Sequence, residues 1–169
     1  MMARCFIGLG SNQDNPASQV SRALEAIGRI PQSVLRARSS LYSSAPLGPQ
    51  DQPSYINAVA LLDTALEPVG LLDALQDIEQ QHGRTRKAER WGPRTLDLDI
   101  LLFDNLTLNS DRLCIPHYHM HARAFVLYPL AELAPELIMP DGTALQQLLS
   151  ECMSDDLVRL PAPPAWLES

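Results

Sequence analysis

A chain of 169 residues is long enough for one domain with a packed core and short for two. Its formal net charge of −7 excludes broad nucleic-acid binding, which needs a basic surface to attract the phosphate backbone. No apolar run approaches the ~20 residues that cross a bilayer, and the N-terminus lacks a signal-peptide pattern. The three cysteines are odd in number and widely spaced, so we expect them to be reduced thiols. We therefore expect a cytoplasmic protein with a single domain over residues 1–160 and a proline-rich tail over 161–169.

Apolar residues recur with period 2 or period 3.6 along the chain and predict its elements. In chain order, we expect a strand at 4–9, a helix at 15–28, strands at 34–42 and 55–62 separated by a proline-rich loop, and a helix at 68–83. A basic loop follows, then a strand at 97–103, a hairpin at 106–108 and 112–115, and helical segments at 122–133 and 143–152. This order predicts an α+β sandwich, in which helices pack on a mostly antiparallel sheet.

Two details of the helices are also predicted. Asp73, Asp77 and Glu79 fall outside the apolar stripe of the helix at 68–83, on its other faces. Pro129 is expected to interrupt the segment at 122–133 or to begin a second helix there, because proline removes a helical hydrogen bond.

A concentrated basic segment lies between the helix at 68–83 and the strand at 97–103. Five of the thirteen basic residues of the chain fall in it: Arg84, Arg86, Lys87, Arg90 and Arg94. Guanidinium groups bind phosphate oxygens through paired hydrogen bonds. Cations gathered in an otherwise acidic chain therefore indicate a small anionic ligand rather than a polymer.

Two carboxylates, Asp97 and Asp99, directly follow this segment at positions i and i+2 of the predicted strand. On a strand such residues share a face, with Cα atoms about 6.6 Å apart. They can converge on one or two Mg²⁺ ions, which combine a few carboxylates with phosphate oxygens of a substrate. Such a pair alone would more often be two acids that face water, but beside the basic segment it predicts a site for phosphoryl transfer.

The segment RWGPRTLDLDILL, residues 90–102, resembles without a gap the signature of the 6-hydroxymethyl-7,8-dihydropterin pyrophosphokinases of folate biosynthesis. The resemblance extends to residues 8–12, 46–53, 55–58, 116–118, 123–125, 134–137 and 140–142. It implies a ferredoxin-like α-β-α sandwich. It also implies Mg²⁺-dependent transfer of pyrophosphate from ATP to 6-hydroxymethyl-7,8-dihydropterin, giving AMP and the pterin methyl diphosphate.

The resemblance further implies roles for individual residues. Asp97 and Asp99 would hold two Mg²⁺ ions, and Arg84 and Arg94 would stabilise charge on the transferring group. The ATP-binding residues would be Gln76, Glu79, Arg86, Lys87, Trp91, Ile100, Arg112, His117, Tyr118 and Arg123. The pterin-binding residues would be Ser44, Ala45, Pro46, Leu47, Tyr55, Asn57, Trp91 and Phe125, with the ring stacked between Tyr55 and Phe125. The chain departs from the family at Ser44-Ala45, where Thr-Pro is usual, and at Cys114, where a hydroxyl residue is common.

From the residues alone, two other functions stay open. A metal-dependent nucleotidyltransferase or phosphohydrolase would use the same acids and cations, the hydrolase with water as acceptor. A non-catalytic binding module would have no use for Asp97, Asp99 and Arg94 together. The alternating His117, His119 and His121 make a poor zinc site, because a short run of three lacks the distant ligands of a tetrahedral cage. We expect a monomer that binds ATP and a reduced pterin, and neither nucleic acid nor membrane.

Overall fold

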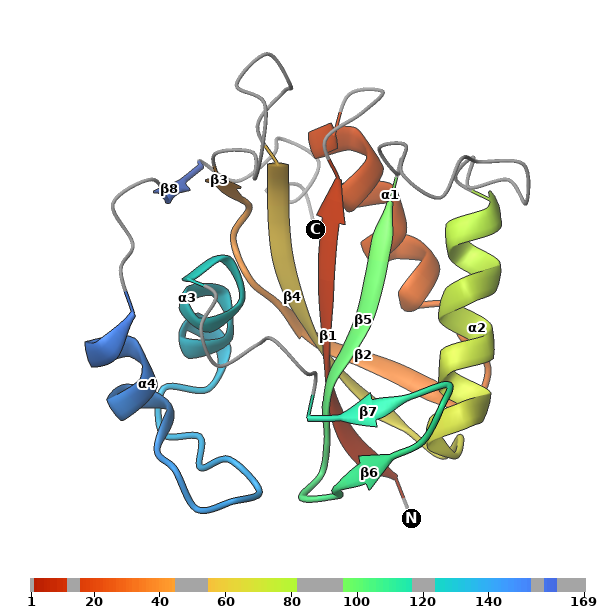
Figure 1. Cartoon of the computed structure of the whole chain (residues 1–169). Helices are drawn as coiled ribbons and strands as arrows, with labels where there is room; N and C mark the ends of the chain where they lie inside the picture. Colours follow the sequence, from red (N-terminus) through yellow and green to blue (C-terminus); the bar gives the residue numbers. More distant parts are fainter. Residues whose placement is uncertain are drawn as a thin grey trace.

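A computed structural model describes residues 2–11, 16–44, 55–81, 96–116, 124–152 and 157–160. Its helices and strands are labelled in Figure 1. They are β1 (Ala3–Ser11), α1 (Pro16–Ile27), β2 (Ser33–Arg38), β3 (Tyr42–Ser44), β4 (Tyr55–Thr64), α2 (Pro68–Gln81), β5 (Asp97–Phe103), β6 (Leu108–Asn109), β7 (Cys114–Ile115), α3 (Ala124–Leu133), α4 (Leu145–Glu151) and β8 (Val158–Arg159). Among the described residues, no helix is both long and apolar enough to span a bilayer.

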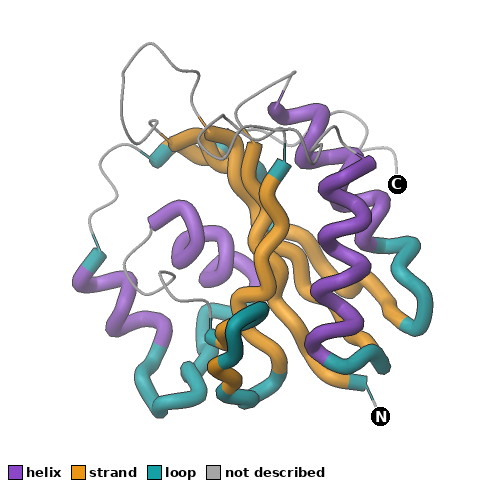
Figure 2. The backbone as a smooth tube through the Cα atoms, turned by 45° about the vertical axis from the view of Figure 1, so that its right-hand side comes forward, coloured by secondary structure: helices purple, strands orange, loops and turns teal. Residues whose placement is uncertain are grey.

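The centre of the molecule is a six-stranded sheet with the order β5-β1-β4-β3-β8, in which β2 also pairs with β4. Each of these strand pairs is antiparallel. Helices α1 and α2 lie on one face of the sheet, and α3 and α4 lie on the other (Figures 1 and 2). The predicted α+β sandwich with a mostly antiparallel sheet is therefore confirmed.

Side chains of the central strands alternate between two apolar clusters, one on each face, because successive residues of a strand point to opposite sides. Cys5, Ile7 and Leu9 of β1 belong to the cluster under α1 and α2. Phe6 belongs to the cluster under α3 and α4. The sheet is thus covered on both sides, and the polar residues of the central strands β1 and β4 lie near the ends of those strands.

One predicted strand is in fact two. The strand expected at 34–42 divides into β2 and β3, which both pair with β4. Ser39 lies at the break, where its backbone N–H donates to the Val59 carbonyl and its hydroxyl accepts a hydrogen bond from the Val59 N–H at 2.9 Å. A side-chain oxygen here replaces a backbone carbonyl, which lets the strand stop without leaving a buried N–H unpaired.

The predicted interruption at Pro129 is wrong. Helix α3 runs through this proline, which is buried together with Val126, Leu127 and Leu130. Packing of this apolar helix on the sheet offsets the one hydrogen bond that proline removes. The other helices begin and end within a few residues of their predicted positions.

The far end of the described chain adds a strand that the sequence pattern did not predict. Val158 pairs with Ser43 and Arg159 with Tyr42, so β8 extends the sheet at its β3 edge. The expected hairpin after β5 is confirmed as β6 and β7. The proposed tail at 161–169 lies outside the described residues.

Candidate active site

Asp97 and Asp99 open strand β5, at the end of the sheet where β1 finishes and β4 begins (Figure 1). Leu98 and Ile100, which alternate with them, are buried in the cluster under α1 and α2. The two carboxylates therefore project from the opposite face, the one that carries α3 and α4. Asp97 is half-buried and Asp99 is exposed, so both can reach a ligand.

A row of paired residues crosses four strands at this end of the sheet. Tyr42 of β3 pairs with Asn57 of β4, Asn57 pairs with Gly10 of β1, and Gly10 pairs with Asp97 of β5. Directly opposed residues of antiparallel strands point to the same face. The buried amide of Asn57 and the carboxylate of Asp97 therefore share a face, separated by two strand spacings, about 10 Å.

Two aromatic residues belong to the elements that border this row. Tyr55 precedes Asn57 by two positions on β4 and pairs with Ser44, whose backbone is described. Phe125 lies in the first turn of α3 and packs against the apolar cluster on the same face of the sheet. Since α3 packs on β3 and β4, the structure brings both elements of the predicted pterin site to one face.

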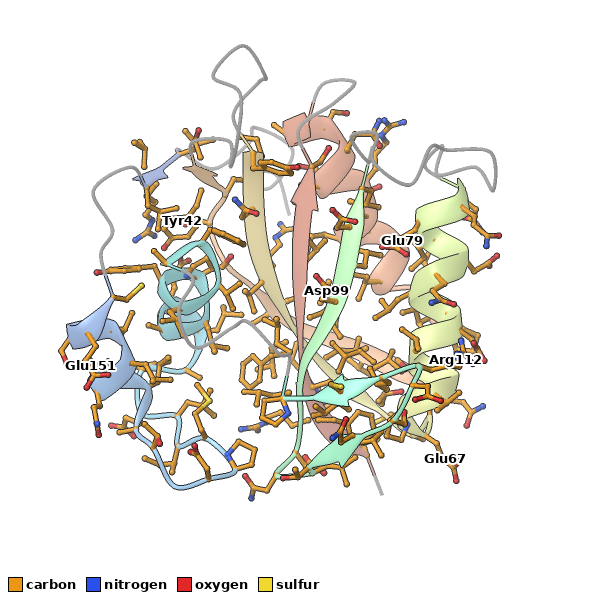
Figure 3. The ribbon with its side chains drawn as sticks, in the orientation of Figure 1. Tyr42, Glu67, Glu79, Asp99, Arg112 and Glu151 are labelled. Carbon is orange, nitrogen blue, oxygen red and sulfur yellow. The ribbon has the colours of Figure 1, made fainter. Side chains whose placement is uncertain are left out.

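Glu79 differs from its predicted place outside the apolar stripe of α2. It is 4% exposed, and its Oε2 accepts a hydrogen bond of 2.8 Å from the backbone N–H of Leu98 (Figure 3). Strand β5 is the edge of the sheet, so its outward N–H groups need an acceptor other than a neighbouring strand. The prediction that Glu79 lies apart from the buried stripe of α2 is wrong, because tertiary packing turns this carboxylate onto the strand between Asp97 and Asp99.

Gln76 and Arg112, both predicted to bind nucleotide, come together on the outside of α2. Arg112 Nη2 donates to Asp73 Oδ1 at 2.7 Å and to Gln76 Oε1 at 3.3 Å. The Arg112–Asp73 ion pair is about half exposed on each side, so it contributes little to stability. Asp73 was not among the predicted site residues, and only the fold places it beside two of them.

Ile100 was predicted to line the nucleotide, but its side chain is 2% exposed and packed in the core. Backbone groups of residues two apart on a strand point the same way. The Leu98 N–H points away from β1 towards Glu79, and the N–H and C=O of Ile100 therefore also point outward at the edge of the sheet. Any contact of Ile100 with a ligand is made by this backbone.

The remaining predicted site residues lie outside the described part of the chain. They are Ala45, Pro46, Leu47, Arg84, Arg86, Lys87, Trp91, Arg94, His117, Tyr118 and Arg123, and only the backbone is described for Ser44. His119 and His121 lie outside it as well.

The donor set at the start of β5 suits a hard divalent cation. The part of the chain that the structure describes contains no group of three or more histidine, cysteine, aspartate or glutamate side chains arranged to hold a metal. Mg²⁺ commonly binds through one or two carboxylates and takes its other ligands from water and substrate phosphates. Asp97 and Asp99 fit that mode of binding, which differs from a closed cage of protein ligands.

An α+β sandwich that presents two carboxylates and a carboxamide on one end of its sheet has the features of an enzyme that transfers phosphoryl groups between small molecules. The family model of 7,8-dihydro-6-hydroxymethylpterin-pyrophosphokinase (HPPK) matches residues 6–135 of the chain. The chain belongs to this family of pyrophosphokinases, which use ATP as co-substrate.

Relatives of nearly the same length support this assignment. A protein of Pseudomonas aeruginosa is 56% identical over 161 residues, which cover 95% of this chain and 99% of that protein. A protein of Haemophilus influenzae is 47% identical over 159 residues, which cover 94% and 99%. Both are named 2-amino-4-hydroxy-6-hydroxymethyldihydropteridine pyrophosphokinase.

Solved structures share the fold at low sequence identity. A Plasmodium falciparum HPPK-DHPS with pteroate matches with a TM-score of 0.72 and 13% identity, over 94% of this chain and 47% of that one. An HPPK-DHPS in complex with substrates matches with a TM-score of 0.73 and 14% identity, over 95% and 48%. The chain thus spans about half the length of these solved proteins, and the likeness bears on the fold alone.

Proposed function

We propose that this chain transfers the pyrophosphoryl group of ATP to the hydroxymethyl group of 6-hydroxymethyl-7,8-dihydropterin and releases AMP, with the row Asn57–Gly10–Asp97 at the centre of its active site. Membership of the pyrophosphokinase family supports the reaction. The pairing of these three residues across β4, β1 and β5 supports the site, because it puts an amide and a carboxylate on one face. We further propose that the chain acts as a cytoplasmic monomer with one domain over residues 1–160.

The acceptor would bind at the β4 side of the row. A carboxamide both donates and accepts hydrogen bonds in one plane, so Asn57 can recognise the edge of a pterin ring. Tyr55 and Phe125 would stack on the faces of the ring, and the loop that begins at Ser44 would contact it through backbone groups. The hydroxymethyl arm would then extend along the sheet towards Asp97.

The nucleotide phosphates would bind at the β5 side of the row. Asp97 and Asp99 would hold two Mg²⁺ ions, which supply positive charge to the phosphates and activate the acceptor hydroxyl when bound. Arg84 and Arg94 would stabilise charge on the transferring group, and Arg86, Lys87, Trp91, His117, Tyr118 and Arg123 would complete the ATP site. Phosphoryl transfer requires little covalent catalysis by the protein. Its rate therefore depends mainly on the positioning of the substrates and on electrostatic stabilisation of the transferring group.

The outer side of β5 and α2 would receive the rest of the nucleotide. The outward N–H and C=O of Ile100 offer a donor and an acceptor next to each other, the pattern that a nucleobase edge requires. Gln76 lies on α2 one turn before Glu79, already in contact with Arg112 of the turn between β6 and β7. Glu79 would act on this side by holding β5 in place.

The reaction can be tested by following the nucleotide products after mixing the chain with ATP, Mg²⁺ and 6-hydroxymethyl-7,8-dihydropterin. We expect AMP that forms only with pterin present and no free pyrophosphate. AMP with free pyrophosphate in the absence of pterin would instead indicate a hydrolase. ATP binding without turnover would indicate a binding module.

A further inference from the structure

Gly10 lies within a strand, where glycine is unfavourable and where the backbone conformation does not require it. It lies near the end of the nine-residue strand β1, and β1 pairs on both sides, with β4 and with β5. Glycine weakens a strand because it has no side chain to pack and more freedom to lose on folding. Its φ is outside the left-handed region, so the backbone here could accommodate any L-residue. The backbone conformation therefore does not require glycine.

The surroundings of Gly10 supply a different reason for glycine. A Cβ atom built on it would lie 3.0 Å from Oδ1 of Asn57, closer than carbon and oxygen ordinarily approach. That amide is 5% exposed, so the room to move away is small. Gly10 itself is only half-buried, although its neighbours Leu9 and Ser11 are buried. The face above Gly10 is thus open, while the amide next to it is confined.

We propose that Gly10 is a specificity-determining residue for the acceptor substrate. Because glycine has no side chain, the Asn57 amide keeps its position and the surface of the sheet between Asn57 and Asp97 stays uncovered. The hydroxymethyl arm of the acceptor would extend along this surface to the metal-binding carboxylates. A methyl group here would both displace the amide and stand on that surface. The inference rests on the proposed function, because it takes Asn57 as an acceptor contact and Asp97 as a metal ligand.

Gly8 provides a matched control on the same strand and the same face. It pairs with Val59 and Asp99, and it is also half-buried. A Cβ on Gly8 would lie 3.2 Å from the side chain of Leu101. Leu101 belongs to the apolar cluster under α3 and α4. An added methyl at Gly8 therefore presses on the core, whereas one at Gly10 presses on the amide of the acceptor site.

The test compares Gly10→Ala and Gly8→Ala with the unmodified chain in the AMP-forming reaction. We expect Gly10→Ala to raise KM for the pterin by about tenfold or more, the effect of one misplaced methyl group in a fitted pocket, and to leave KM for ATP within about twofold. Gly8→Ala is expected to leave both KM values within about twofold. The dissociation constant of the pterin, measured with Mg²⁺ and a non-hydrolysable ATP analogue, should show the same selectivity.

A Gly10→Ala variant that binds pterin as tightly as the unmodified chain would overturn the inference. Equal weakening of pterin and ATP would also overturn it, because that pattern indicates general damage to the fold. Failure of the proposed function has a separate signature. In that case the unmodified chain itself forms no pterin-dependent AMP.

Discussion

At the residue scale, the carboxylates of β5 are the groups on which turnover should depend most. Asp97 is half-buried and Asp99 exposed, so neither side chain contributes to the core. We expect Asp97→Ala and Asp99→Ala each to lower kcat by about two to three orders of magnitude, since charge stabilisation of the transferring group is lost. Initial rates of AMP formation, with unfolding curves recorded on the same samples, would measure this.

Asp77 is a suitable control for both substitutions. It is an exposed acid on α2 whose carboxylate accepts a hydrogen bond from Gln81. Asp77→Ala should leave kcat unchanged. Retained turnover in both the Asp97 and the Asp99 variant would refute the metal assignment.

The hydroxyl of Tyr42 makes stability depend on pH in the alkaline range. It donates to Oε1 of Glu132 at 2.8 Å. Burial, and then the hydrogen bond and the negative charge of Glu132, raise the pKa of Tyr42 from 10.0 to about 12. The unfolded chain therefore loses this proton first as pH rises.

The contribution of Tyr42 to the free energy of unfolding is fully present below pH 10 and is lost as the pH rises towards 12. Burial also raises the pKa of the Cys5 thiol from 9.0 to about 12, which adds to the same trend. The free energy of unfolding, measured with urea, should fall more steeply between pH 10 and 12 for the unmodified chain than for Tyr42→Phe. Parallel pH profiles for the two proteins would contradict the raised pKa of Tyr42.

At the element scale, the contact between α2 and β5 fixes the strand that carries the metal site. Glu79 accepts the N–H of Leu98, and Leu98 lies between the two aspartates. Glu79→Ala would leave this buried N–H without an acceptor, which typically costs about 1–3 kcal/mol of unfolding free energy. Glu79→Gln retains an acceptor oxygen and should lose less.

Stability and turnover separate the two roles that Glu79 could have. If the contact positions β5, Glu79→Ala lowers kcat as well as stability, and Glu79→Gln restores a large part of both. A loss of stability with unchanged kcat would mean that the contact only holds the fold together.

A second junction of elements lies on the opposite side of the sheet. The carboxylate of Glu132 on α3 accepts hydrogen bonds from the N–H and hydroxyl of Ser40 and from Tyr42. Arg159 of β8 approaches the same carboxylate at 3.8 Å and donates to the Ser40 hydroxyl at 3.0 Å. One side chain therefore links α3, the start of β3 and the added strand β8.

At the scale of the whole molecule, the two apolar clusters pack on opposite faces of the same sheet. Unfolding of one cluster would therefore disrupt the sheet and expose the other cluster to water. We expect a single unfolding transition. Leu24→Ala on α1 and Leu127→Ala on α3 remove fully buried side chains and should each cost about 2–5 kcal/mol. Circular dichroism and tryptophan fluorescence should give coincident transitions for both variants, and two separate transitions would contradict this expectation.

Much of this protein is determined by its sequence alone, because hydrophobic periodicity reports which face of an element is buried. The alternation of Leu98 and Ile100 with Asp97 and Asp99 predicts the strand and the placement of both carboxylates on one face of it. The stripe of Val20, Leu24 and Ile27 predicts α1 in the same way.

Tertiary structure decided the features that depend on partners distant in the chain. Periodicity could not show that Glu79 turns inward, since the N–H that it accepts belongs to an edge strand 19 residues away. It could not show that α3 continues through Pro129, because packing on the sheet offsets the lost hydrogen bond. Nor could it align Asn57, Gly10 and Asp97, because that row exists only in the register of three strands, and register is a property of pairing rather than of any one segment.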